Sequence, residues 1–417
     1  MARKKVFKLE QKPIKYIENN PELGRVIDWN YIQAKLRELV TPYTENSYVP
    51  YPPMNSANWF VINSERSVGK TTNILLMGML ASWVYDGDVR IEYLRIKKEQ
   101  VRPVNTAQLF ATIENPTFEY VQKITQGKYN GIYYDRHFYY WCNYVDGKVD
   151  KESISAEPFM HIEATDNLNT FKSNYNTAAT SFVILDEFVN ASGVNREDDF
   201  LNLCHTLSTY RRMKIDMKIF MLANAINPYN RFYKELCISD DMRMLKLGEE
   251  KIVTALQGTK VWIKLVKFDE KITEKRRVNA LLYFGFANPK LSGIVGGQEW
   301  AIKNYPHLPR LDEEETRNCV LTGVYLRFYD KLLCLEIWNS STMGAYMYVR
   351  EQTRTPVKPL RIYTQDTCYS NIERFGLGTG DNLDRIILTL YKNGRTFYSY
   401  NDVGNLFENY VLELNKR

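Results

Sequence analysis

Runs of mostly apolar residues recur along the first two thirds of the chain. They occupy residues 59–62, 90–96, 182–185 and 218–222. Such runs are typical of parallel strands that are buried on both faces. Amphipathic helical patterns lie between them near 71–84 and 198–213, and a further helix is expected at 28–40. Strands that alternate with helices predict an α/β domain built on a mostly parallel sheet.

Two segments interrupt this alternation. Residues 131–149 form a hairpin-like insertion with its turn at Asp146-Gly147, because Asp-Gly favours the left-handed backbone of a tight turn. Residues 43–58 are rich in proline and tyrosine, which predicts an extended arm that leads into the first strand.

The pattern changes after about residue 270. A charged run at 271–277 and a glycine-rich run at 293–297 are typical of a linker. Aromatic and aliphatic strand patterns then occupy 325–329, 332–338 and 346–349, and helical patterns follow at 382–391 and 401–414. Strands followed by helices predict a second, α+β domain.

These patterns suggest four parts of the chain. We expect a basic arm and helix at 1–57, the α/β domain at 58–270, a linker at 271–304 and the α+β domain at 305–417. A chain of 417 residues is long enough for two or three domains. Its 44% apolar and 25% charged residues are those of a folded globular protein rather than a disordered or fibrous one.

Targeting and metal signals are weak in this sequence. The chain shows neither the ~18 uninterrupted apolar residues of a membrane helix nor the apolar core of a signal peptide. Its six cysteines and four histidines show no spacing typical of a zinc site or a disulfide scaffold. We therefore expect an intracellular protein with reduced thiols and no membrane partner.

The net charge of +6 is concentrated at one end of the chain. Residues 1–16 hold six lysines and arginines against one glutamate, so the other 401 residues sum to about +1. A broad basic surface is therefore not expected. Contact with nucleic acid would depend on a few local cations or on the N-terminal tail.

A candidate phosphate-binding loop lies between the first strand and the helix near 71–84. It comprises Ser64, Glu65, Arg66, Ser67, Val68, Gly69, Lys70, Thr71 and Thr72. In a loop of the type G-x-x-x-x-G-K-[ST], a Walker A motif, backbone N–H groups surround the β-phosphate, lysine reaches the β- and γ-oxygens, and a hydroxyl binds Mg²⁺. Gly69, Lys70 and Thr71 supply these groups, whereas Ser64 stands where the motif has its first glycine.

Two carboxylates complete the predicted nucleotide site. Asp186 and Glu187 directly follow the buried strand 182–185, as in a Walker B motif. Together with Thr71, an aspartate in this position holds Mg²⁺, and a following glutamate can act as the general base toward water. The alternative is two solvated acids at a strand end.

Asn224 follows the strand at 218–222. The carboxyl ends of strands in open α/β sheets border the ligand crevice, so this amide is a candidate to sense the γ-phosphate and orient the attacking water. The alternative is a cap of a strand-end turn.

In order along the chain, these segments resemble the DNA-packaging ATPases of short-tailed bacteriophages of the phi-29 type. The resemblance rests on 60–62 with the loop containing Arg66, on 94–98, on 183–188, and on 222–229. It covers about residues 58–235 well and the rest weakly. The chain departs from the family in its missing loop glycine, longer N-terminal arm and longer C-terminal domain.

The resemblance implies a fold and a function. The fold would be an additional-strand (ASCE) P-loop ATPase domain followed by an RNase H-like domain related to the terminase nuclease. The protein would use ATP and Mg²⁺ to drive double-stranded DNA through the portal protein into an empty capsid, as a homopentameric ring in the host cytoplasm that docks transiently at the portal vertex. The sequence leaves open the ring stoichiometry and step size, and whether a scaffold RNA takes part.

The resemblance also implies roles for several cations. Arg211 or Arg212 would act in trans on the γ-phosphate of a neighbouring subunit, Arg66 would act in cis, and Lys172 matches a further basic position. The alternative for the arginine pair is stabilisation of a helix C-terminus. The cations expected to face DNA in a central channel, or else to cap a solvated strand end, are Lys97, Lys98 and Arg102.

The role of the C-terminal domain rests on its acids. A two-metal nuclease needs several clustered carboxylates, whereas the strands from 325 to 349 supply only Asp330 and Glu336. We therefore expect a domain that grips DNA rather than cuts it. Two other functions remain open: a terminase-like enzyme with an active nuclease, and a non-catalytic DNA-binding capsid component with a degenerate P-loop.

Overall fold

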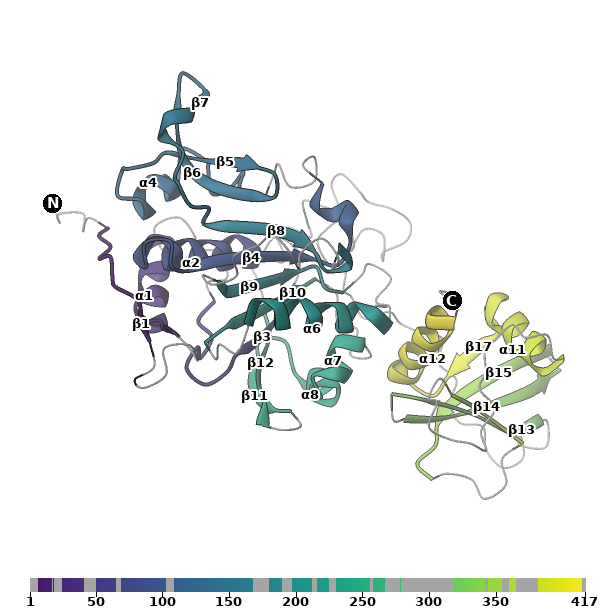
Figure 1. Cartoon of the computed structure of the whole chain (residues 1–417). Coiled ribbons are helices and arrows are strands. Elements are labelled where there is room, and N and C mark those ends of the chain that lie inside the picture. Colours follow the sequence, from purple (N-terminus) through teal and green to yellow (C-terminus); the bar gives the residue numbers. More distant parts are fainter. Residues whose placement is uncertain are drawn as a thin grey trace. The chain divides into compact units, whose positions relative to one another are not determined.

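The structure is a computed structural model that divides into two compact units (Figure 1). One unit comprises Met1–Ala191, Glu197–Ile226 and Glu235–Trp300, and the other comprises Ser192–Arg196, Asn227–Lys234 and Ala301–Arg417. The residues that the structure describes are 7–16, 18, 25–40, 50–64, 69–102, 109–167, 180–189, 197–211, 216–224, 230–255, 258–266, 278, 319–329, 331–341, 344–354, 360–364 and 382–414. Apart from Val278, the predicted linker 271–304 lies outside these residues.

The first unit is organised around a sheet of ten strands. Its strand order is β11-β12-β3-β10-β9-β4-β8-β6-β5, with β7 beside β6. The strands are β3 (Trp59–Asn63), β4 (Arg90–Arg95), β5 (Gly131–Asp135), β6 (Phe138–Val145), β7 (Lys148–Asp150), β8 (Met160–Ala164), β9 (Thr180–Asp186), β10 (Lys218–Ala223), β11 (Glu250–Thr254) and β12 (Lys260–Leu265). The strands from β12 to β8 pair in parallel, and β11, β5, β6 and β7 pair antiparallel. The predicted mostly parallel sheet is confirmed.

Helices cover both faces of the parallel part. Helix α1 (Trp29–Val40) and helix α2 (Lys70–Val84) share a core with Phe60, Phe182 and Phe220. Trp59 and Ile219 instead border a cavity together with α6 (Glu197–Arg211). Because successive side chains of a strand point to opposite faces, α6 lies on the face opposite α1 and α2. The helices predicted at 28–40, 71–84 and 198–213 are confirmed to within two residues.

Shorter elements complete the first unit. They are the strands β1 (Lys15–Tyr16) and β2 (Arg25–Val26), the helices α4 (Tyr120–Ile124) and α8 (Ser239–Met244), and the 3₁₀ turns η2 (Lys98–Val101), η3 (Lys151–Ser153) and η4 (Thr165–Asn167). The chain before β1 lies against α2, where the Lys12 N–H donates to the carbonyl oxygen of Val84 at 2.7 Å. No helix among the described residues is both long and apolar enough to cross a bilayer.

The insertion predicted at 131–149 is more elaborate than a single hairpin. The expected turn at Asp146-Gly147 joins β6 to β7, and both of its residues have positive φ angles, 51° and 75°. A second turn, Arg136-His137, joins β5 to β6 with φ angles of 45° and 76°. This second turn was missed because arginine and histidine are not typical of the left-handed conformation that it requires.

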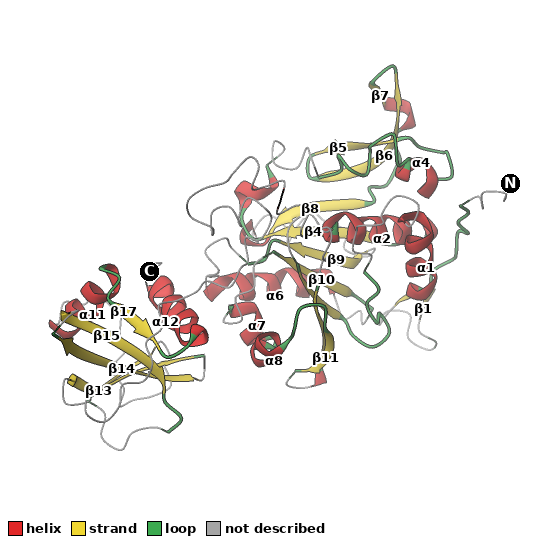
Figure 2. Ribbon diagram, turned by 180° about the vertical axis from the view of Figure 1, so that it is seen from behind, coloured by secondary structure: helices red, strands yellow, loops and turns green. Residues whose placement is uncertain are grey.

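The second unit is α+β, as predicted (Figure 2). Its sheet has the order β16-β13-β14-β15-β17, in which β13, β14 and β15 are antiparallel and the outer strands pair in parallel. The elements are β13 (Cys319–Phe328), β14 (Lys331–Ser340), β15 (Gly344–Glu351), β16 (Arg361–Thr364), α11 (Asn382–Lys392), β17 (Thr396–Tyr398) and α12 (Asn401–Leu414). Apolar residues of α11 and α12 share a core with β13, β14 and β15. The short helix α7 (Arg231–Glu235) groups mostly with this unit.

Candidate active site

Polar side chains meet where three neighbouring parallel strands end. Strand β10 lies between β3 and β9, so the segments that follow these strands leave the sheet at one edge. Asp186 is the last residue of β9, Asn224 follows β10, and Ser64 follows β3 and leads toward α2. The carboxyl edge of an open parallel sheet is where such folds bind ligands.

The start of α2 supplies a lysine at this edge. Gly69 adopts the left-handed conformation with φ 81° at the N-cap, where a residue with a Cβ would be strained. Lys70 is the first residue of the helix, is buried, and donates a hydrogen bond to the amide oxygen of Asn224. The structure therefore brings Lys70 and Asn224 together at a helix N-terminus, which is a favourable place for phosphate.

Asp186 is the most constrained acid of the site. Its side chain is 4% exposed, and its Oδ2 accepts hydrogen bonds from the Thr71 hydroxyl at 3.2 Å and the Tyr93 hydroxyl at 2.5 Å. Its Oδ1 accepts the N–H of Glu187 at 3.0 Å. A hydroxyl and a carboxylate are hard oxygen ligands, so Thr71 and Asp186 fit Mg²⁺.

An arginine that the sequence reasoning missed neutralises both acids. Arg95, the last residue of β4, places Nη1 2.5 Å from Glu187 Oε2 and Nη2 3.4 Å from Asp186 Oδ2. Although burial opposes the charged form, the neighbouring Tyr93, Asp186 and Glu187 raise the pKa of Arg95. Glu187 has a φ of 53°, which is uncommon for a residue with a Cβ, and half of its side chain is exposed.

The sequence reasoning gave neither Tyr93 nor Arg95 a role in the site. The two residues lie two positions apart on β4, a strand that was predicted only from its apolar residues. The available signal was a tyrosine and an arginine at alternate positions, which places their side chains on one face of the strand. Strand β4 pairs with the strand that ends in Asp186, so both side chains reach that carboxylate.

The other predicted residues of this edge divide into described and undescribed ones. Ser64 is buried and donates its N–H to the carbonyl oxygen of Ala223 at 3.2 Å, and Thr72 lies half-buried in α2. The predicted residues outside the described part are Glu65, Arg66, Ser67, Val68, Lys172 and Arg212. The exposed cations that follow β4 are Lys97, Lys98 and Arg102.

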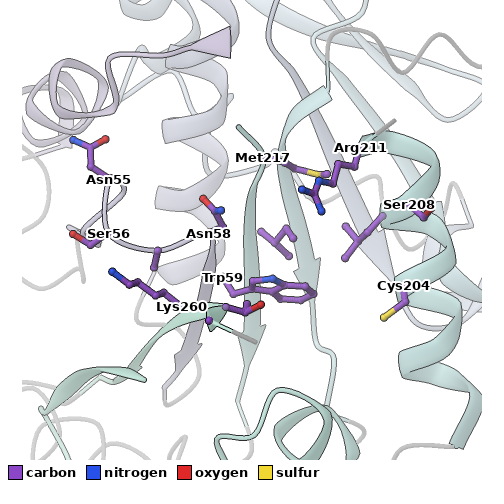
Figure 3. Close-up of a pocket in the computed structure, with 14 residues that line it drawn as sticks. Asn55, Ser56, Asn58, Trp59, Cys204, Ser208, Arg211, Met217 and Lys260 are labelled. Carbon is purple, nitrogen blue, oxygen red and sulfur yellow. The ribbon is translucent and has the colours of Figure 1, made fainter. Parts of the chain in front are cut away.

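Arg211 lies near the amino ends of the parallel strands, at the edge of the sheet opposite the Lys70 and Asp186 cluster. It borders a cavity of about 1000 Å³ together with Trp59, Ile219 and Lys260, which mark the amino ends of β3, β10 and β12 (Figure 3). The six residues of β10 span about 20 Å between this edge and Asn224. The structure therefore does not bring Arg211 to the Lys70 and Asp186 cluster of its own chain.

Two buried acids of the second unit, Glu336 and Asp384, are paired with arginines. Arg350 Nε donates to Glu336 Oε1 at 2.9 Å, and the buried Asp384 accepts from the Tyr363 hydroxyl at 2.8 Å and lies 3.4 Å from Arg361 Nη1. Asp330 lies outside the described residues. Within the part that the structure describes, no three His, Cys, Asp or Glu residues are grouped to hold a metal ion.

Solved structures identify the fold. The Phi-28 gp11 DNA packaging motor is 13% identical to the chain, covers 86% of this chain and 95% of its own, and gives a TM-score of 0.50. The chain has the fold of this packaging motor. The bacteriophage Phi-29 viral genome packaging motor assembly is 14% identical, with 88% of this chain and 100% of that chain covered and a TM-score of 0.49.

One further solved structure is similar to part of the chain. The N-terminal domain of the DNA packaging ATPase from bacteriophage phi29 is 16% identical, with a TM-score of 0.35, over 52% of this chain and 95% of that one. No protein-family model matches the chain, and the comparison with curated proteins finds no similar sequence.

Proposed function

We propose that the chain is an ATPase that packages viral double-stranded DNA into a preformed capsid. The observation that carries the proposal is the cluster of Lys70, Thr71, Asp186 and Asn224 at one sheet edge, in a chain with the fold of a DNA packaging motor. The fold alone would also suit a non-catalytic relative. The cluster argues for catalysis, because it combines a phosphate-binding lysine with oxygen ligands for a metal.

Each residue has a distinct task in this proposal. Lys70 binds the β- and γ-phosphate oxygens of ATP, and Thr71 and Asp186 hold Mg²⁺, which when bound offsets phosphate charge. Glu187 accepts the proton of the attacking water as general base, and Asn224 orients that water. Since Glu187 is paired with Arg95 in the structure, this pair has to open before the carboxylate can act.

The proposal includes assembly into a ring, for which we expect five copies. Arg211 lies at the amino edge of the sheet, and Asn224 lies at the carboxyl edge, which is one strand length of about 20 Å away, so Arg211 would act on ATP bound to a neighbouring copy. Arg212 remains an alternative in trans, and Arg66 in cis. The ring would assemble in the host cytoplasm and dock on the portal protein, with a scaffold RNA as a further possible component.

Exposed cations and the second unit are the proposed DNA contacts. Lys97, Lys98 and Arg102 follow β4 at the nucleotide edge of the sheet and would meet DNA phosphates. For the second unit we propose a gripping role, because its described buried acids Glu336 and Asp384 are each engaged by an arginine. The full chain incubated with plasmid DNA in Mg²⁺ or Mn²⁺ should leave the DNA intact, whereas cutting that depends on one of these acids would establish a nuclease.

The main test is ATP hydrolysis by the purified full chain, with and without double-stranded DNA. We expect Mg²⁺-dependent hydrolysis that DNA stimulates and that Lys70→Ala abolishes. The matched control is Lys35→Ala, which removes a lysine that pairs with Glu38 on α1, away from the sheet edge. A chain that neither binds nor hydrolyses ATP would establish the non-catalytic alternative.

A further inference from the structure

Tyr93 is buried in the interior of the sheet and directed at the nucleotide edge. It lies on β4 opposite Ile184 of β9 and is 1% exposed. Its hydroxyl reaches past Ile184 to Asp186 Oδ2, at a distance of 2.5 Å. A buried tyrosine hydroxyl needs a partner, and here that partner is the acid proposed to hold the metal.

The direction of this hydrogen bond is defined. An ionised carboxylate has no proton to donate and can only accept. The Tyr93 hydroxyl is therefore the donor and Asp186 Oδ2 the acceptor. Hydrogen bonds to an ionised group are shorter and stronger than those between neutral groups, which agrees with this distance.

Asp186 accepts three hydrogen bonds and lies 3.4 Å from Arg95 Nη2, and one of its three hydrogen-bond donors has another task. Thr71 and Tyr93 donate to Oδ2, and the N–H of Glu187 donates to Oδ1. In the proposed function, the Thr71 hydroxyl is itself a ligand of Mg²⁺. Its bond to Asp186 is then weakened when the metal is bound, whereas the Tyr93 hydroxyl has no task except to hold Oδ2.

We propose that Tyr93 is a positioning residue for the metal site: its hydroxyl fixes the Asp186 carboxylate in the orientation that receives Mg²⁺. This inference rests on the proposed function, because it assigns the metal to Asp186. Partners that orient metal ligands from behind typically change metal affinity 10- to 100-fold when they are removed. Tyr93 acts through Asp186 and does not touch ATP.

The test is the Mg²⁺ requirement of nucleotide binding in Tyr93→Phe, which deletes one oxygen atom. Binding of a fluorescent, non-hydrolysable ATP analogue to the full chain is titrated with Mg²⁺ and is also measured in EDTA. We expect the Mg²⁺ concentration for half-saturation to rise about 10-fold or more, and binding in EDTA to stay unchanged. If Tyr93 had only a packing role, its replacement would not raise the Mg²⁺ requirement while leaving nucleotide binding in EDTA unchanged.

Tyr85→Phe is the matched control. Tyr85 is also buried, and its hydroxyl accepts the Asp28 N–H at 2.7 Å, remote from the sheet edge. This variant should lose some thermal stability and keep the wild-type Mg²⁺ requirement. An equal rise in the Mg²⁺ requirement of both variants would overturn the inference, because it would reflect a general loss of a buried hydrogen bond.

A double-mutant cycle tests whether Tyr93 acts through Asp186. Adding Tyr93→Phe to Asp186→Asn should cause no further change in the Mg²⁺ requirement, and a further rise would overturn the inference. The double variant also serves if Tyr93→Phe alone does not fold, since no ionised carboxylate is then left short of a donor. A wild-type chain without Mg²⁺-dependent nucleotide binding would refute the proposed function itself, whereas a wild-type Mg²⁺ requirement in a folded Tyr93→Phe would overturn only the role of Tyr93.

Discussion

Replacing Arg95 with methionine tests whether this guanidinium is the counterion of the buried Asp186 and the half-exposed Glu187. Methionine keeps the apolar stem and removes the charge that faces Asp186 and Glu187. Loss of one partner from a buried ion pair costs about 3–5 kcal/mol, because the other charge stays buried without compensation. We expect less here, about 2–3 kcal/mol, since Asp186 keeps the hydrogen bonds from Thr71, Tyr93 and Glu187.

The loss of the pair between Arg95 and Glu187 adds little to this loss of stability. Half of the Glu187 side chain is exposed, so water solvates the carboxylate once Arg95 is gone, and an exposed pair contributes at most about 1 kcal/mol. For a unit of this size, each kcal/mol lowers the melting temperature by about 2–4 °C. The predicted decrease for Arg95→Met is therefore about 4–12 °C.

The assay is thermal unfolding of the full chain followed by tryptophan fluorescence. Six of the seven tryptophans lie in the first unit, and five of them are among the described residues, so the signal reports mainly on the unit that holds Arg95. The matched control is Arg90→Met on the same strand. The acid that pairs with Arg90, Glu157, is 73% exposed and is solvated without it. Arg90 Nε also donates to the carbonyl oxygen of Pro158 at 3.2 Å, but this acceptor is neutral, so the variant should lose clearly less stability than one that leaves a buried carboxylate without its counterion.

Two results would refute this reasoning. One is an Arg95→Met variant that unfolds at the same temperature as Arg90→Met. The other is an equal loss from Arg95→Met in the Asp186→Asn background, because the uncharged amide no longer needs the guanidinium and the loss should then be smaller.

Three further outcomes can be measured on the same protein. Glu187→Gln should bind the ATP analogue like the wild type and hydrolyse ATP about 10²–10⁴ times more slowly, as is typical when a general base is lost, so wild-type turnover would remove Glu187 from the mechanism. Gly78→Ala should lower the thermal stability of the first unit, because a Cβ would lie 2.8 Å from the Ile91 side chain and overpacking costs about 1–3 kcal/mol against about 1 kcal/mol gained in helix propensity. Burial raises the pKa of Cys142 to about 11, so little of this thiol is ionised at pH 8, and the thiolate fraction increases only as the pH approaches that pKa. An alkylating reagent followed by peptide mass spectrometry should therefore label the exposed Cys204 and Cys237 before Cys142. Early labelling of Cys142 would contradict its burial.

The sequence predicted the parts of the fold in which burial is purely apolar. Strands β3, β9 and β10 are continuous apolar runs, and the chemistry at their ends follows from parallel topology alone. Strand β8 was missed because His161 and Glu163 interrupt its pattern. His161 is nonetheless buried, since its Nδ1 lies 2.9 Å from Glu92 of the adjacent β4. Strand β4 was predicted although it contains Glu92, whereas two polar residues among the five of β8 leave too little apolar pattern to predict a strand.

The candidate site was also predicted only in part: residues in local motifs were predicted from the sequence, and residues brought in by strand pairing were not. Lys70, Thr71 and Asp186 belong to local motifs that the sequence displays directly. Tyr93 and Arg95 lie about 90 residues before Asp186, and only the pairing of β4 with β9 makes them its neighbours. No local spacing encodes that contact. Arg211 was proposed from a resemblance, and the structure adds that it lies at the edge opposite the Lys70 and Asp186 cluster of its own chain.

The two edges of the sheet constrain how copies of the chain would complete one another's sites. Asp186 and Asn224 lie at the carboxyl edge, and the cavity bordered by Arg211 and Lys260 lies at the amino edge. In a two-fold dimer, residue i of one copy contacts residue j of the other and j contacts i, so a single interface would have to include both the Arg211 cavity and the carboxyl edge, which lie one strand length of about 20 Å apart. A head-to-tail contact brings the amino edge of one copy to the carboxyl edge of the next, and only closure into a ring supplies every site. If Arg211 acts in trans as proposed, the separation of the two edges favours the head-to-tail ring over the two-fold dimer as the active form.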